Sequence, residues 1–313
     1  MRAPGESRPV CGGEIPGSGG EPVFFLYDHD PSALPVLLAV PHAGRAYPPA
    51  VLDLMRNPGA SGLRLEDRHA DRIAQLAAQE TGAPLLLAHA PWAMIDLNRG
   101  PADLDREMIR GDGRVSGRRE LPPGWRTRSG LGLVPRRLPG FGDLWKGPLE
   151  QDDVTARIER IHDPYHRALG RTLAAMRDRW GTALLLDIHS MPPLPATLSG
   201  APTPVCVLGD RFGASCDGQL AMMAYDFLAG EGLAVAHNRP YAGGYVLERH
   251  GSPVQGIHAI QIEFCRTLYL DSRLAEPSDG LPILGGILSR LVARLATEVA
   301  ALGRGRQWGL AAE

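Results

Sequence analysis

Two apolar segments far apart in this chain are each followed by a histidine, and this feature restricts the fold most. Residues 36–40 are all apolar and precede His42, while residues 183–186 are all apolar and precede His189. A short apolar run of this kind is typical of a strand buried on both faces of a parallel sheet. Ligands of open α/β sheets bind beyond the carboxyl ends of such strands. We therefore expect an α/β fold in which both imidazoles lie at one edge of the sheet.

Apolar runs alternate with amphipathic stretches along most of this 313-residue chain. The alternation is typical of βα units, so we expect further strands of one sheet and helices packed against them. The expected strands cover residues 23–27, 36–40, 85–89, 93–96, 183–188, 205–208, 233–237 and 259–263. The expected helices cover residues 65–81, 152–180, 219–230 and 281–301. Pro164 is expected to kink or break the second helix, because proline has no backbone N–H to donate.

Three regions of different composition define the expected domain organisation. Residues 1–20 are rich in glycine, proline, serine and charge, which predicts a flexible N-terminal tail. Residues 21–305 show no internal repeat and no shift that marks a second domain, so we expect one domain. Within it, residues 101–150 are rich in glycine, proline and arginine and have weak periodicity. We interpret this segment as a long excursion over the sheet edge, because such loops are usually functional or disordered.

Composition and charge restrict the partners and the compartment. The net charge is −2, which offers no electrostatic case for binding nucleic acid or an anionic membrane. No apolar run approaches the roughly 18 to 20 residues that a membrane span needs. The four cysteines show no paired spacing typical of a metal site, so we expect reduced thiols in a cytoplasmic protein. Assembly into a homo-oligomer is left open.

The two histidines at the strand ends are the first candidates for a metal site. His42 and His189 are two of the ligands that a catalytic zinc site needs. Asp67 is the preferred third ligand, and His69 and Asp71 are the alternatives. In the competing interpretation the histidines belong to the core, and Asp67 stabilises the start of a helix through the helix dipole. The expected cofactor is a divalent metal, with zinc preferred because imidazole and carboxylate ligands suit it.

Polar residues at the ends of two further apolar segments complete the candidate site. Asn98 and Arg99 follow residues 93–96, and a guanidinium is the natural bidentate partner of a carboxylate. Glu263 ends the last apolar strand, where burial is costly unless the carboxylate is paired or functional. With a raised pKa it would be a good general base for metal-activated water. The alternatives are an arginine that caps a surface turn and a glutamate paired with Arg266 or another internal cation.

Taken together, these segments resemble the N-formylglutamate amidohydrolase family. The matching segments occur in order and cover most of the chain from about residue 36 to residue 271. They are Pro41-His42-Ala43-Gly44, residues 66–72, Ile95-Asp96-Leu97-Asn98-Arg99, Asp187-Ile188-His189-Ser190, residues 209–216, residues 238–245, and Gln261-Ile262-Glu263 with Tyr269. Each motif alone is weak, but the ordered set is specific.

The resemblance implies a fold and a reaction. The fold is a three-layer α/β/α sandwich with a mixed, mostly parallel central sheet, similar to the zinc carboxypeptidases and to phosphorylase/hydrolase-like domains. The reaction is metal-dependent hydrolysis of an N-acyl amino acid, with N-formyl-L-glutamate giving formate and L-glutamate in histidine degradation. The implied partner is thus a small-molecule N-acyl amino acid.

The resemblance also implies roles for individual residues. The implied metal ligands are His42, Asp67 and His189. The implied substrate-binding residues are Asn98, Arg99, Tyr245 and Arg249. Glu263 matches the general base of the carboxypeptidase relatives. Residues 101–148 differ from the shorter segment of the characterised deformylases, so the acyl group and the amino acid both stay open.

Other function classes have less support in the sequence. A serine hydrolase would use Ser190 or Ser215, but neither lies in a Gly-x-Ser-x-Gly elbow. A cysteine amidase would use Cys216 or Cys265, and neither has a recognised nucleophile context. Two further alternatives keep the same fold: an amidohydrolase of another N-acyl amino acid or small peptide, and a catalytically inactive metal- or ligand-binding α/β protein.

Overall fold

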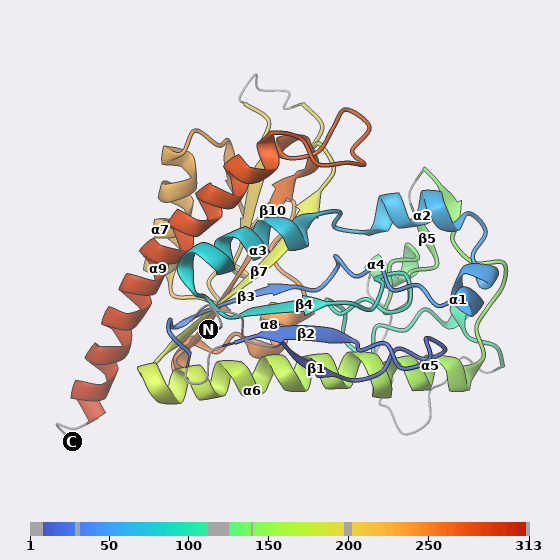
Figure 1. Ribbon diagram of the computed structural model, residues 1–313, viewed down its shortest axis with the longest axis horizontal. Helices are drawn as coiled ribbons and strands as arrows, with labels where there is room; N and C mark the ends of the chain where they lie inside the picture. The colour runs from blue at the N-terminus through green and yellow to red at the C-terminus, as the bar shows by residue number, and fades with distance from the viewer. Residues whose placement is uncertain (1–8, 29–31, 112–124, 139, 197–201, 311–313) are drawn as a thin grey trace, which may run out of the picture.

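One eight-stranded sheet forms the centre of the computed structural model, which describes residues 9–28, 32–111, 125–138, 140–196 and 202–310 (Figure 1). The strand order is β1-β2-β4-β3-β7-β10-β8-β9. These strands are β1 (Val10–Gly12), β2 (Phe24–Tyr27), β3 (Val36–Val40), β4 (Leu85–Ala88), β7 (Ala183–Met191), β8 (Cys206–Gly209), β9 (Val235–His237) and β10 (Ile257–Cys265). A separate two-stranded sheet pairs β5 (Arg137–Leu138) with β6 (Gly142–Asp143).

The four central strands of the sheet run parallel. β4, β3, β7 and β10 pair in parallel, whereas β2 is antiparallel to β4 and β8 is antiparallel to β10. The sheet is therefore mixed, as predicted. The apolar runs that precede the two histidines form the neighbours β3 and β7, with Val36 opposite Leu184. Because the two strands are parallel, their carboxyl ends lie at the same edge.

Helices cover both faces of the sheet (Figure 1). One face packs against α5 (Gln151–Arg157), the π-helical turn η2 (Ile158–His162), α6 (Asp163–Trp180) and α8 (Tyr245–His250). The opposite face packs against α3 (Ala70–Thr81), α7 (Gly218–Gly230) and α9 (Gly280–Leu310). Successive strand side chains alternate between the faces, so Leu37 and Leu185 contact the first group and Leu38 and Leu186 the second. The predicted three-layer α/β/α fold is confirmed.

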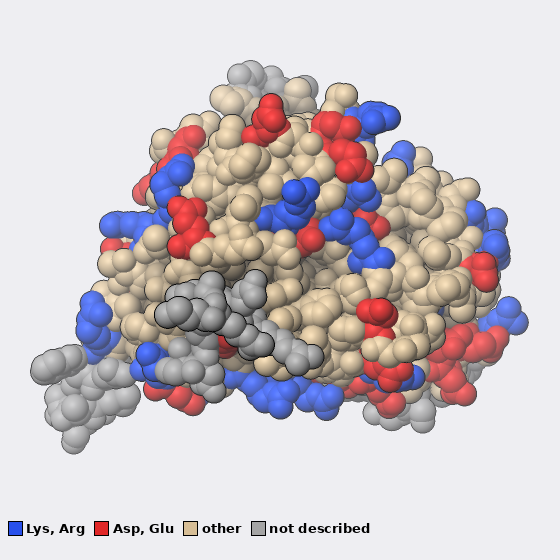
Figure 2. Space-filling model, viewed as in Figure 1, with Lys and Arg blue, Asp and Glu red and all other residues tan. Residues whose placement is uncertain are grey.

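Shorter elements connect these layers. The remaining helices are α1 (Pro49–Leu54), α2 (Pro58–Leu65), α4 (Trp125–Arg128) and the 3-10 turns η1 (Arg106–Met108), η3 (Pro253–Gln255) and η4 (Arg266–Leu268). None of the helices within the described ranges has the length and hydropathy of a membrane span. On the face of the molecule drawn in Figure 2, basic and acidic side chains are interspersed.

The helix expected over residues 65–81 is wrong at its start. α2 ends at Leu65 and α3 begins at Ala70, because Glu66 is extended and His69 adopts a left-handed conformation with φ 58°. Asp67 therefore lies in the link between two helices. It does not share a helix face with Asp71, and the predicted dipole interaction at a helix start does not apply to it.

The strand expected over residues 93–96 is also wrong. These residues form turns outside the sheet, held by hydrogen bonds such as Met94 N to Pro91 O and Arg99 N to Asp96 O. Their apolar side chains are nevertheless buried, which explains why the sequence resembles a strand. The other predicted strands and helices are present, with ends shifted by at most three residues except at α9, which extends beyond the expected end at residue 301 to Leu310.

Pro164 does not end its helix. The helical run continues from α5 through the π-helical turn η2 into α6, which begins one residue before Pro164. The wider π turn directly before the proline removes the need for the N–H that proline lacks. The predicted irregularity is thus a π-helical turn inside a continuous helical run.

The predicted flexible tail over residues 1–20 is wrong for part of its length. β1 pairs antiparallel with β2 at the edge of the sheet, and Ile15 is fully buried in the core. Residues 1–8 lie outside the described residues. The described part of the 101–150 excursion includes β5 and β6, and residues 112–124 and 139 lie outside the described ranges.

Candidate metal centre and active site

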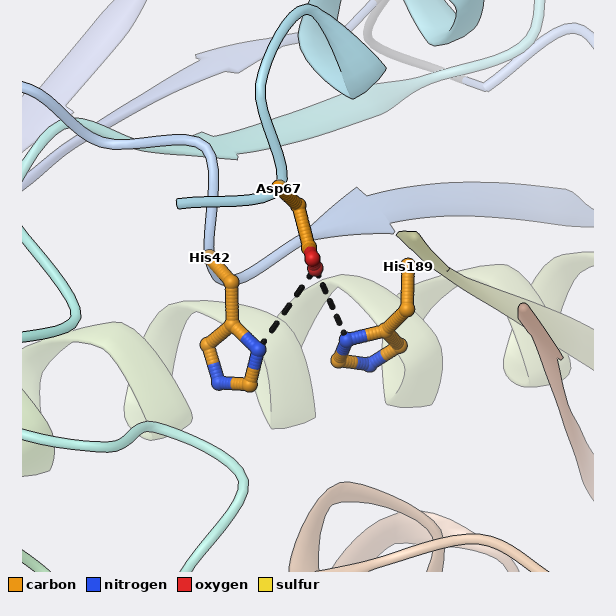
Figure 3. A group of neighbouring side chains, drawn as sticks. All are labelled: His42, Asp67 and His189. Atoms are coloured by element: carbon orange, nitrogen blue, oxygen red, sulfur yellow. Dashed lines mark hydrogen bonds and ion pairs between the residues drawn. The ribbon is translucent and has the colours of Figure 1, made fainter. Parts of the chain in front are cut away.

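His42, Asp67 and His189 converge at the carboxyl edge of the sheet. Asp67 Oδ2 lies 3.2 Å from His189 Nδ1 and 3.6 Å from His42 Nδ1. Figure 3 shows the Asp67 carboxylate placed between the two imidazoles. One potential ligand atom from each of the three residues lies within 4.8 Å of the others. All three side chains are buried. The structure therefore brings together the three residues predicted as metal ligands.

Three separate segments position these ligands. His42 follows β3, and His189 lies near the end of the neighbouring β7. Asp67 enters from the link between α2 and α3, where its backbone N–H donates to the carbonyl of His42 at 3.0 Å. This backbone hydrogen bond fixes the link against the end of β3. The fold thus brings Asp67 and His189 together although they are far apart in the sequence.

A second carboxylate orients each imidazole. His42 Nε2 lies 2.9 Å from Asp96 Oδ1, and His189 Nε2 lies 2.8 Å from Asp187 Oδ2. With its Nε2 proton donated to a carboxylate, each ring presents Nδ1 to the centre. Carboxylate–histidine pairs of this kind fix the tautomer of metal-binding histidines and raise their basicity. The arrangement fits a divalent metal held by two imidazole nitrogens and one carboxylate oxygen.

The other oxygen of Asp67 is held by a hydrogen-bond chain. Ser190 Oγ donates to Asp67 Oδ1 at 2.9 Å, and Arg266 Nε donates to Ser190 Oγ at 3.1 Å. Arg266 is buried and also donates to the carbonyl of Glu66 at 2.7 Å. Asp67 Oδ2 is consequently directed at the two imidazoles. Arg266 is therefore engaged with Ser190 and Asp67, and the predicted alternative of a Glu263–Arg266 pair is wrong.

Buried negative charge favours a cation at this centre. Burial opposes ionisation of Asp67, but its interactions with the imidazoles of His189 and His42 outweigh the effect of burial and hold its pKa well below the usual range. Burial lowers the pKa of both imidazoles, but the carboxylates of Asp96 and Asp187 outweigh it and raise each pKa above its ordinary value. The site therefore stabilises positive charge between the rings, which a bound metal supplies equally well.

The two alternative third ligands lie elsewhere. His69 Nε2 is 3.8 Å from the carboxylate of Glu276, and Asp71 accepts a hydrogen bond from Arg45 at 2.7 Å. The left-handed backbone of His69 turns the chain between Asp67 and α3. Of the three acidic and imidazole candidates in this segment, Asp67 is the one that reaches the imidazoles.

Glu263 lies beside His189 in the sheet. The two residues are paired in register on the parallel strands β10 and β7, as are Gln261 and Asp187. Side chains two residues apart on a strand share one face, so all four polar side chains point to the same side. Burial raises the pKa of Glu263 to about 7. A carboxyl with this pKa can both accept and release a proton near neutral pH.

One cavity of about 880 Å³ contains the candidate metal ligands and Glu263. Its lining combines polar and apolar side chains from segments far apart in the sequence. The lining residues are His42, Ala60, Leu63, Arg64, Asp67, Trp92, Asp96, Asn98, Arg99, Leu131, Leu138, His189, Ser190, Met191, Pro192, Tyr241, Gly243, Gly244, Gln261, Glu263, Arg266, Arg273 and Leu274. The volume is that of a typical small-molecule site.

Asn98 and Arg99 both line this cavity, and their role in substrate binding stays a prediction. Arg99 Nε donates to the carbonyl of Leu131 at 3.2 Å and lies 3.8 Å from Asp96 Oδ2. These contacts hold the guanidinium at the cavity wall while leaving further N–H groups for a ligand. The Asn98 side chain, in contrast to that of Arg99, forms hydrogen bonds within the protein through both of its polar atoms. Its oxygen accepts from Val246 N at 2.9 Å and its nitrogen donates to Gln261.

Tyr245 and Arg249 are not among the residues that line the cavity, and their contacts near the scissile carbonyl stay a prediction. Both belong to the short helix α8, where Arg249 donates to the Tyr245 hydroxyl at 3.0 Å. The Tyr245 ring packs against the buried rings of His162 and His166. Tyr241, from the loop before α8, lines the cavity.

Several cavity residues had no assigned role in the sequence prediction. Trp92 stacks on His42 with ring centroids 4.2 Å apart, and Gln261 donates to Glu263 at 2.8 Å. Trp92 follows a proline after an apolar strand, and Gln261 lies two residues before Glu263 on the same strand face. Side chains two residues apart on a strand share a face, so the position of Gln261 relative to Glu263 could have indicated that both face the site. No pattern in the sequence marked Trp92.

The fold and the donor set define the class of this protein: an α/β/α enzyme domain with a candidate metal centre at the carboxyl edge of its sheet. A family model described as N-formylglutamate amidohydrolase matches residues 34–270. An N-formylglutamate deformylase of Pseudomonas aeruginosa is 30% identical, covering 77% of this chain and 84% of that protein. One of Pseudomonas putida is 31% identical, covering 76% and 82%.

Solved structures agree with this comparison. The crystal structure of an N-formylglutamate amidohydrolase from Ralstonia eutropha JMP134 has a TM-score of 0.79 and 30% identity, covering 88% of this chain and 98% of that chain. A gene product of Agrobacterium tumefaciens shares the fold, with a TM-score of 0.63 and 18% identity over 88% of this chain and 96% of that chain. This chain belongs to the N-formylglutamate amidohydrolase family, whose members hydrolyse carbon–nitrogen amide bonds.

Asp187→Asn tests whether the outer carboxylates support metal binding. The substitution keeps the shape of the side chain but removes the charge that orients His189. We expect zinc affinity to fall by roughly 10 to 100-fold, measured by competition with a chromophoric chelator. Asp178→Asn, on the exposed end of α6, is the matched control and should leave the affinity unchanged. Equal affinity of Asp187→Asn and wild type would contradict this role.

Proposed function

We propose that this protein is a metal-dependent deformylase that hydrolyses N-formyl-L-glutamate to formate and L-glutamate. The observation that carries the proposal is the buried His42–Asp67–His189 donor set in one cavity with Glu263. The relatives from Pseudomonas are named N-formylglutamate deformylases, which supports the same substrate for this chain.

His42, Asp67 and His189 are the residues that would hold the metal, and zinc is proposed because it commonly takes imidazole nitrogen and carboxylate oxygen ligands. When bound, such a cation supplies Lewis-acid chemistry, polarising a carbonyl and lowering the pKa of water. Asp96 and Asp187 orient the imidazoles.

Glu263 is the proposed proton carrier. Its buried carboxyl has a pKa raised to about 7, so the ionised form is available near neutral pH. It takes one proton from the attacking water and returns it to the nitrogen of the leaving amino acid. The net reaction adds water across the amide bond, and Glu263 ends in its starting protonation state.

Arginine side chains explain how the cavity would bind a dicarboxylate substrate. Arg99 is held at the wall by the carbonyl of Leu131, and Arg64 and Arg273 also line the cavity. A guanidinium binds a carboxylate with paired N–H donors, and a fixed one sets the distance from carboxylate to scissile bond. We assign this positioning role to Arg99.

A different N-acyl amino acid or a small peptide is the second candidate substrate. Leu131 and Leu138, from the 101–150 excursion, line the cavity together with Leu63 and Leu274. These leucines give the cavity an apolar wall beside its charged groups. The observation favours a substrate range that includes larger acyl or amino acid groups.

Metal removal separates the proposed reaction from its alternatives. We expect wild-type protein to release formate and glutamate from N-formyl-L-glutamate, to lose this activity after chelation, and to regain it with added zinc. Formate release is measured beside a panel of N-acetyl and N-succinyl amino acids. Activity that survives complete metal removal would indicate a serine or cysteine enzyme. Metal binding without hydrolysis of any panel member would indicate an inactive binding protein.

Glu263→Gln tests the proton carrier. The amide keeps the size of the side chain but has no basic oxygen for proton transfer, so we expect kcat to fall by roughly 100 to 10,000-fold. Bound metal, measured by elemental analysis, should stay at the wild-type level. A variant with full metal and full activity would remove Glu263 from the mechanism.

Arg99→Ala tests carboxylate binding. We expect KM for N-formyl-L-glutamate to rise by roughly 10 to 100-fold, because one charge-assisted pair with the substrate is lost. Arg99→Lys keeps the charge without the planar fork and should recover only part of the affinity. Steady-state kinetics of both variants make the measurement. An unchanged KM in Arg99→Ala would contradict the assignment.

A further inference from the structure

Gln261 contacts the candidate general base and two other segments of the site. Its Nε2 donates to Glu263 Oε1 at 2.8 Å. Its Oε1 accepts from Asn98 Nδ2 at 3.0 Å and from the backbone N–H of Gly244 at 3.2 Å. Gln261 is buried and lies on the same face of β10 as Glu263. One side chain thus joins the last strand, the segment after residue 96 and the loop before α8.

The three hydrogen bonds are compatible with only one orientation of the Gln261 amide. Asn98 Nδ2 and Gly244 N are both donors, so they require the amide oxygen on their side. The amide nitrogen must then face Glu263 and donate to it. The reverse orientation would place an N–H against two other N–H groups and an oxygen against a carboxylate. The neighbours therefore determine the direction of the bond to Glu263.

This fixed donor determines which oxygen of Glu263 can carry a proton. A proton on Oε1 of Glu263 would make that oxygen a weaker acceptor and would compete with the N–H of Gln261 for its lone pairs. The bond from Gln261 therefore favours Oε1 as the acceptor whether Glu263 is ionised or protonated. Among the hydrogen bonds of the described residues, Oε1 is the oxygen of Glu263 that is engaged. Oε2 is therefore the oxygen of Glu263 that is available to carry the transferred proton.

We propose that Gln261 is a positioning residue that holds Glu263 Oε1 as an acceptor and so assigns proton transfer to Oε2. This inference rests on the proposed function, because it requires Glu263 as the proton carrier. It also gives Asn98 a different role from the predicted one. The amide groups of Asn98 are bonded to Val246 N and Gln261, so Asn98 acts on Glu263 through Gln261.

Gly244 shows how closely the three segments fit. A Cβ atom at this position would lie 2.4 Å from Asn98 Oδ1 and 2.7 Å from Asn98 Nδ2. The loop before α8 can therefore approach Asn98 only with glycine here. The absence of a side chain is what allows the backbone N–H of Gly244 to reach Gln261.

The test compares Gln261→Met and Gln261→Glu with wild type. Methionine has a similar length but neither donates nor accepts as an amide does. Glutamate keeps the acceptor for Asn98 and Gly244, and it has no donor for Glu263 when it is assayed at a pH at which both carboxyls are ionised. We expect both variants to lower kcat for N-formyl-L-glutamate by roughly 10 to 100-fold, because a misplaced reacting group costs about that much. KM should stay within about threefold of wild type, and bound zinc should be unchanged.

The controls distinguish this inference from the proposed function. Gln255→Met places the same change at an exposed position beyond the other end of β10 and should match wild type. A rise in KM at constant kcat would overturn the inference, because Gln261 would then contact substrate. Full activity of Gln261→Glu would overturn it too, and this variant decides if Gln261→Met does not fold. If the Gln261 variants are fully active and Glu263→Gln is inactive, the inference about Gln261 is wrong and the proposed function stands. If Glu263→Gln is active, Glu263 is not the base and the proposed mechanism is wrong.

Discussion

The interaction on which the site depends is the placement of the Asp67 carboxylate between two buried imidazoles. A carboxylate removed from water is costly unless charged or hydrogen-bonded partners surround it. Here His42 and His189 face one oxygen, while Ser190, supported by Arg266, donates to the other. The arrangement leaves a centre that favours positive charge, and the surrounding structure holds each partner in one orientation.

The parallel sheet makes this convergence geometrically simple. β3 and β7 are neighbours, so the residues that follow them emerge at one edge. β10 lies on the other side of β7 in parallel register, which places Glu263 beside His189. Polar residues at alternate positions then share the face that opens into the cavity. The carboxyl ends of three adjacent strands thus bring both imidazoles and the proposed proton carrier to one edge of the sheet.

Irregular segments supply what the strands do not. The link between α2 and α3 carries Asp67, and turns around residue 96 carry a carboxylate for His42 and the guanidinium of Arg99. The loop before α8 contributes Tyr241 and the N–H of Gly244. Gln261 connects two of these segments to the last strand. The rigid sheet therefore fixes the reacting groups, while the loops shape the cavity around the substrate.

The sequence by itself determined the α/β class, the two strand-end histidines and Glu263, because buried strands have a local apolar pattern and a period of two that can be read directly. It also indicated Asp67 and Arg99, although the helix and strand assigned to their segments were wrong, since turns with buried apolar residues imitate regular elements. Only the tertiary structure decided between Asp67, His69 and Asp71, and placed Tyr245 and Arg249 outside the cavity. Those outcomes depend on contacts between residues 200 or more positions apart, such as Arg266 with Glu66, for which no local pattern exists.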